Sequence, residues 1–156
     1  MINIKDHITF ENLLKINELC LLKGEPFAVI GKNRICSALG NQIQPYPSKE
    51  QAFASMYKSL VINHGFLNGN KRTGVIALYI SSKLIDNPLK INDKDLCELT
   101  YKIAGEGGSQ ILVEDITNMV FKYKVSNKEL SNNFDLENLV REYIKTHEWL
   151  INELAK

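Results

Sequence analysis

Hydrophobic positions along this 156-residue chain recur mainly every three or four residues, which is the period of an amphipathic helix. The clearest stripe runs from Ala52 to Val61, behind a pair (Ser48 and Gln51) that matches the capping box of a helix start. No segment carries the strict alternation of a convincing β-strand. The pattern therefore predicts an all-α fold, with helices over about 10–22, 33–39, 48–63, 71–84, 93–105 and 113–123.

Two non-helical segments interrupt this pattern. Pro45 and Pro47 predict a loop or a small flap over residues 40–48, because proline lacks an N–H donor and restricts the residue before it. Residues 126–134 are polar and indicate a linker. The chain is therefore expected to comprise a main domain over 1–125, this linker, and a C-terminal amphipathic helix over 135–156.

The C-terminal helix carries a heptad-like seam. Its apolar or amphipathic positions are separated by steps of four and three: Leu136, Val140, Tyr143, His147, Leu150 and Leu154. Fewer than three heptads favour packing against the helix's own domain, with His147 as an interfacial side chain. Pairing with a partner or with a second copy, giving a homo-oligomer, is the alternative.

Composition narrows the class of protein. The chain has 19 Lys and Arg against 18 Asp and Glu, a formal net charge of +1, and 44% hydrophobic residues. These values are typical of one soluble globular domain and argue against nucleic acid or an anionic membrane as partner. No apolar run is long enough to span a membrane. Three widely spaced cysteines favour neither disulfides nor zinc, so a reducing, cytoplasmic location is expected.

The segment 64–74, HGFLNGNKRTG, combines groups that suit anion chemistry. The N-terminus of a helix presents unpaired N–H groups to an anion, and Gly69 lets the backbone approach a phosphate closely. Lys71 and Arg72 add cationic donors, and Arg72 is one of only three arginines in the chain, with Arg34 and Arg141. His64 has the near-neutral pKa that suits a general base.

This segment resembles the signature of the Fic/Doc family, HxFx(D/E)(G/A)N(G/K)RxxR, and in particular its death-on-curing (Doc) toxin branch. The similarity extends upstream through residues 33–64 and covers roughly residues 5–123. It implies an all-helical bundle that transfers part of a nucleotide-type substrate onto a protein hydroxyl. The flap over residues 40–48 is then expected to align the target segment by backbone pairing.

The resemblance assigns roles to single residues. His64 would be the catalytic base that deprotonates the target hydroxyl, and Phe66 would anchor the loop to the core. Gly69, Asn70, Lys71 and Arg72 would bind the nucleotide phosphates. Lys at position 71, where AMP-transferring members have Gly, favours the kinase activity of the Doc branch, and Val75 in place of a second Arg points the same way. Arg34 is expected to have a structural or a substrate-side role.

One position departs from the family pattern. Asn68 stands where the resemblance expects the acid that holds the Mg²⁺ of ATP or another nucleoside triphosphate. Mg²⁺ prefers charged oxygen ligands, and one charge at about 4 Å is worth ~4 kcal/mol at an intermediate dielectric. Asn68 is consistent with a natural variant of altered chemistry, a degenerate site, or an inactivating substitution.

Three functions follow from the sequence. The first is a Doc-like toxin of a toxin–antitoxin module, a kinase that phosphorylates a Ser or Thr of a translation factor, with elongation factor Tu implied by the resemblance, and that a small antitoxin neutralises. The second is AMP transfer to a protein hydroxyl, which Lys71 disfavours. The third is a Fic-fold binding protein that Asn68 has left without turnover.

Overall fold

The computed structural model describes residues 3–40, 46–126, 130 and 133–156, and the secondary structure of this part is helical, without strands. The expected all-α fold is confirmed. The predicted flap and linker lie largely outside the described residues, since 41–45, 127–129 and 131–132 are among those not described. The helices are α1 (Phe10–Cys20), α2 (Lys32–Ala38), α3 (Lys49–Asn63), α4 (Asn70–Leu84), α5 (Asp93–Ala104), α6 (Val113–Val120), α7 (Leu136–Thr146) and α8 (Glu148–Glu153).

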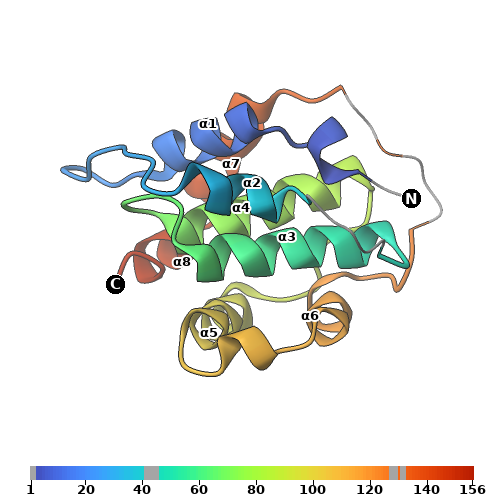
Figure 1. Cartoon of the computed structure of the whole chain (residues 1–156). Coiled ribbons are helices and arrows are strands. Elements are labelled where there is room, and N and C mark those ends of the chain that lie inside the picture. The colour runs from blue at the N-terminus through green and yellow to red at the C-terminus, as the bar shows by residue number, and fades with distance from the viewer. Residues whose placement is uncertain (1–2, 41–45, 127–129, 131–132) are drawn as a thin grey trace.

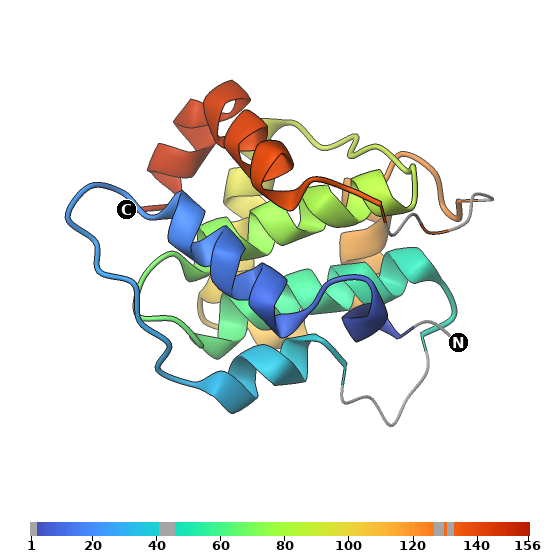
Figure 2. The ribbon, with the colours of Figure 1, turned by 90° about the horizontal axis from the view of Figure 1, so that it is seen from above.

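The helices form three layers (Figure 1). An α3–α4 hairpin makes the middle layer, with α1, α2 and α7 above it and α5 and α6 below it. The view from above shows α1 and α7 crossing the hairpin side by side (Figure 2). The buried side chains of all three layers form one continuous apolar core.

Close packing holds the central hairpin together. The Ser48 hydroxyl accepts a hydrogen bond from the Gln51 amide at 3.1 Å and caps the start of α3, as the sequence predicts. Further along, a Cβ on Gly74 of α4 would come within 2.8 Å of Val61 Cγ2 on α3. A glycine at this position lets α3 and α4 pack closely. Because the two helices are held together in this way, the ends of the loop that joins them are fixed.

The single helix predicted over 135–156 is two helices. The backbone leaves the helical conformation at His147, where φ is −120° and ψ is 38°. His147 Nδ1 lies 2.8 Å from Asp93 Oδ1 at the start of α5, and its ring stacks on Tyr143 with centroids 4.1 Å apart. These contacts hold the imidazole at the bend, and the pattern of apolar spacing alone does not reveal them.

The seam of the C-terminal region faces this chain's own core. Val140, Tyr143, Leu150 and Leu154 are buried, and α7 packs against α1 and α4 while α8 packs against α5. The seam is therefore covered within one chain, and it is not available for pairing with a second copy. No helix among the described residues has the length and apolar character needed to cross a bilayer.

A substitution at Leu150 tests this packing. Leu150→Ala should lower the free energy of unfolding by about 2–5 kcal/mol in urea denaturation, because the fully buried side chain leaves a cavity. Lys145→Ala, an exposed position on α7, is the control and should change it by less than about 0.5 kcal/mol. Unchanged stability in Leu150→Ala together with loss of self-association would contradict the intramolecular role.

Candidate functional site

The loop between α3 and α4 has a defined backbone. α3 ends at His64, whose φ of 50° and ψ of 50° place it in the left-handed region, and α4 begins after Gly69, whose φ is 79°. A Cβ on Gly69 would lie 3.0 Å from Asn17 Nδ2 of α1. Glycine is required here both for the positive φ and for close contact with α1, in addition to the predicted role beside a phosphate.

Asn70 closes this loop. Its Oδ1 accepts a hydrogen bond from the Phe66 amide at 3.0 Å, and its Nδ2 donates to the Phe66 carbonyl at 2.8 Å. The Asn70 side chain, predicted to contact phosphate, is thus bound to the backbone of its own loop. The Phe66 ring is buried at 2% exposure, in the anchoring position expected from the sequence.

Residues 28–31, which directly precede α2, lie alongside the loop between α3 and α4. The amides of Ile30 and Gly31 donate to the Gly65 carbonyl at 2.9 and 3.0 Å, and the Leu67 amide donates to the Ala28 carbonyl at 2.9 Å. Ile30 and Leu67 are both more than half exposed, so apolar side chains flank the loop on its solvent side.

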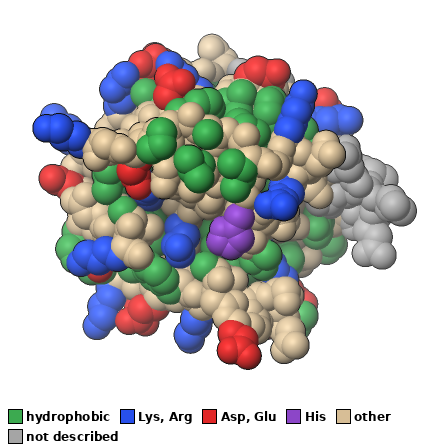
Figure 3. Space-filling model, turned by 60° about the vertical axis from the view of Figure 1, so that its left-hand side comes forward, with side chains coloured by type: hydrophobic (Ala, Val, Ile, Leu, Met, Phe, Trp, Pro, Cys, Tyr) green, Lys and Arg blue, Asp and Glu red, His purple; other side chains and the backbone are tan. Residues whose placement is uncertain are grey.

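The His64 side chain is exposed, and no described residue forms a hydrogen bond with its ring. Its carbonyl accepts from Arg34 Nη1 at 3.4 Å, so Arg34 contacts the backbone of the motif histidine. Figure 3 shows a face on which a histidine reaches the surface between Lys and Arg side chains. The His64 imidazole is therefore open to a solvent-borne hydroxyl.

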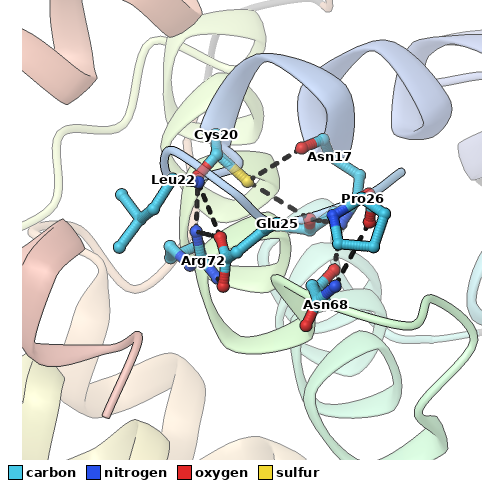
Figure 4. Close-up of polar contacts among 8 residues, drawn as sticks. Asn17, Cys20, Leu22, Glu25, Pro26, Asn68 and Arg72 are labelled. Atoms are coloured by element: carbon cyan, nitrogen blue, oxygen red, sulfur yellow. Dashed lines mark hydrogen bonds and ion pairs between the residues drawn. The ribbon is translucent and has the colours of Figure 1, made fainter. Parts of the chain in front are cut away.

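Arg72 is not an open phosphate clamp. Its side chain is 2% exposed, and Nη1 and Nη2 pair with the two carboxylate oxygens of Glu25 at 2.7 and 2.9 Å. Nη1 also donates to the Cys20 carbonyl at 2.6 Å (Figure 4). The guanidinium that the motif assigns to phosphate is thus bound to the segment following α1.

Glu25 was not predicted from the sequence. Its carboxylate accepts from the Leu22 amide at 2.6 Å as well as from Arg72, and the Arg72 hydrogen bonds hold its pKa below the usual range. No motif identifies it, because it lies 47 residues from Arg72 in an irregular segment. The Glu25–Arg72 pair cancels the charge of Arg72 within the site.

The Asn68 amide is used as a donor. The side-chain Nδ2 of Asn68 donates to the Pro26 carbonyl at 3.2 Å, and the backbone carbonyl of Asn68 accepts from Asn17 Nδ2 at 2.7 Å (Figure 4). Cys20 Sγ donates to the Asn17 backbone carbonyl, and burial raises the pKa of Cys20 to about 11, so it remains a thiol. This network ties α1 to the loop.

The donor set does not fit the Mg²⁺ that the resemblance implies. Asn68 offers a neutral amide, and both carboxylate oxygens of Glu25, the acid that lines the same pocket, are already hydrogen-bonded, by Arg72 and by the Leu22 amide. Among the described residues no group of three or more His, Cys, Asp or Glu side chains is placed to hold a metal ion. The residues present do not form a magnesium site of their own.

A pocket of about 230 Å³ joins these groups. Its walls are Glu25, His64, the loop and first turn over residues 67–72, and residues 154–156 at the end of the chain. Lys71 also lines it, and Lys71 Nζ lies 5.2 Å from the centroid of the Tyr101 ring. The structure thus brings the predicted residues 64 and 68–72 together and adds two elements that sequence reasoning missed, Glu25 and the C-terminal segment.

No family model, curated protein or solved structure matches this chain.

The Glu25–Arg72 pair makes stability depend on pH. Glu25→Gln should lower the free energy of unfolding at pH 7 by about 2 kcal/mol, less than for a fully enclosed pair because Glu25 is 24% exposed. The lowered native pKa means that this contribution is present above about pH 4.3, the pKa of an unpaired Glu, and is lost as the pH falls through the native value.

Urea denaturation between pH 7 and about pH 3 measures this effect, and the gap between wild type and Glu25→Gln should narrow toward the acid end. Glu18→Gln, an exposed position on α1, is the matched control and should give a small, pH-independent difference. A gap that stayed constant down to pH 3 would show that the carboxylate charge does not stabilise the fold.

Proposed function

We propose that this chain is a Fic/Doc-like transferase of the death-on-curing type, which moves the terminal phosphate of a nucleoside triphosphate to a Ser or Thr hydroxyl of a protein. The observation that carries the proposal is the shared pocket of His64, Lys71 and the first turn of α4. A solvent-accessible imidazole there lies beside a helix N-terminus, which attracts anions.

The chemistry assigned to each group is as follows. His64 accepts the proton of the target hydroxyl as its oxygen bonds to the terminal phosphorus. The bond from that phosphorus to the bridging oxygen breaks, and the nucleoside diphosphate leaves with the electron pair. Lys71 and the first amides of α4 stabilise the negative charge on the phosphate oxygens. Asn70 acts by holding the loop in shape.

The surroundings of His64 suit a protein substrate. Phe27, Ile30 and Leu67 expose apolar surface next to the loop, and exposed apolar patches beside a polar centre favour a protein partner. By resemblance the target is a translation factor, with elongation factor Tu the first candidate, and a small antitoxin is the expected inhibitor in the cytoplasm. The nucleotide would bring Mg²⁺ with its phosphates.

A second candidate is a Fic-fold binding protein without turnover. Two observations favour it: the Asn68 amide donates to the Pro26 carbonyl, and Arg72 is neutralised by Glu25. AMP transfer has no comparable support, since Lys71 replaces the Gly of AMP-transferring members and Val75 is buried in the core.

Labelled nucleotide distinguishes these functions. With purified elongation factor Tu, Mg²⁺ and γ-labelled ATP, we expect label on the target with the wild-type chain and more with Asn68→Asp, which restores the acid. His64→Asn should lower the rate by about 10²–10⁴-fold through loss of the base, while Asn tolerates the left-handed backbone at this position.

Two controls accompany this assay. Asn68→Asp removes the donor to Pro26, so its free energy of unfolding should fall by about 1 kcal/mol and must be measured alongside. Label from α-labelled ATP would instead indicate AMP transfer. The binding protein would be favoured if a folded Asn68→Asp chain transferred neither the α-label nor the γ-label to any protein tested, whether elongation factor Tu or another translation factor.

A further inference from the structure

The end of the chain forms one wall of the candidate site. Leu154, Ala155 and Lys156 line the pocket that also holds His64 and Lys71, and Figures 1 and 2 both place the C-terminal residues beside the α3–α4 loop. These residues lie outside the part of the chain that resembles the Fic/Doc family. The motif therefore assigns them no role.

The C-terminal segment is held firmly in this position. Leu150, Ile151 and Leu154 are buried, and the Tyr101 hydroxyl donates to the Glu153 carbonyl at 2.6 Å. The same Tyr101 ring lies under Lys71 Nζ. One side chain of α5 thus supports both the motif lysine and the end of the chain, which keeps their relative positions fixed.

The charges of the pocket show which side chains can meet an anion. Its described lining holds three side chains that are cationic at neutral pH, Lys71, Arg72 and Lys156. Arg72 is buried, and breaking its pair with Glu25 would leave the guanidinium without its carboxylate partner. Lys156 pairs with Glu153 at 2.8 Å, but its side chain is 72% exposed, and solvent screens such surface pairs so that they add little stability. Lys156 can therefore exchange Glu153 for a ligand oxygen, whereas Arg72 is not free to do so.

The size of the pocket indicates which part of a ligand enters it. Sites that enclose a whole drug-sized molecule measure about 300–1,000 Å³, larger than the 230 Å³ found here. The volume suits a phosphate chain, with a nucleoside outside it.

We propose that Lys156 is the second phosphate-binding side chain of this site, so that the pocket takes a ligand with linked phosphates held between Lys71 and Lys156. This inference rests on the proposed function and deepens it, because it names the ligand class as an oligophosphate. Lys156 supplies the cation that the motif assigns to Arg72. The oligophosphate could be inorganic or part of a nucleotide, because Lys71 and Lys156 would bind the linked phosphates of either one in the same way.

Titration calorimetry with the full chain tests this. For tripolyphosphate we expect Lys156→Ala to weaken binding about fivefold, the effect of losing one exposed ion pair of ~1 kcal/mol. For inorganic phosphate, a single group that Lys71 alone would hold on this proposal, the change should stay below about twofold, the range of a negligible surface effect. Lys71→Ala should weaken both ligands, and Lys156→Arg should retain affinity because it keeps the charge. Lys145→Ala, an exposed lysine of α7 outside the pocket lining, is the matched control and should change neither.

The outcomes separate the two proposals. If Lys71→Ala weakens tripolyphosphate but Lys156→Ala does not, the Lys156 inference is overturned and the phosphate site of the proposed function remains. If the wild-type chain binds neither tripolyphosphate nor ATP, both fail. Binding of ATP without tripolyphosphate would overturn the inference alone, because recognition would then rest on the nucleoside. Equal fivefold losses for ATP and tripolyphosphate in Lys156→Ala would support it for both sources.

Discussion

The site depends on one pair of hydrogen bonds, those between the Asn70 side chain and the backbone of Phe66. They close the turn between α3 and α4 into a fixed ring, with the Phe66 side chain in the core on one side. Gly69 takes its left-handed conformation within this ring, and His64 takes its own two residues before the ring begins. The Asn70 amide therefore fixes the turn that leads into α4, while the hydrogen bonds from Ile30 and Gly31 to the Gly65 carbonyl hold the residues next to His64.

A second constraint is the ion pair between Arg72 and Glu25. It draws the irregular segment after α1 against the first turn of α4, and the Asn17–Asn68 hydrogen bond ties α1 itself to the loop before α4. The arginine stabilises the fold of the site at the expense of its own access to ligand. On the proposal made above, cationic recognition rests on Lys71 and Lys156 in place of Arg72, which the motif alone would assign to the phosphate.

Most of the helices could be predicted from the sequence, because each follows from spacing and capping within one segment, as at Ser48 and Gln51. The features that escaped prediction are contacts between distant segments. Glu25 has no periodic or motif signal, since its role exists only through Arg72. The bend at His147 depends on Asp93, 54 positions earlier, and continuous apolar spacing conceals it. The residues of a motif can be found in a sequence, but the side chains that bind to them, such as Glu25 to Arg72, can be identified only from the folded structure.

The C-terminal region links folding to the site. Leu150 and Leu154 belong to the same core as the α3–α4 hairpin, and Leu154 also lines the pocket together with Ala155 and Lys156. A ligand held between Lys71 and Lys156 contacts both the hairpin and the end of the chain, and it binds the folded state alone. Mass action then requires that such a ligand stabilise the packing of α8 as well as the loop. The segment directly after α8, residues 154–156, is on this argument part of the binding site, and α8 holds it there.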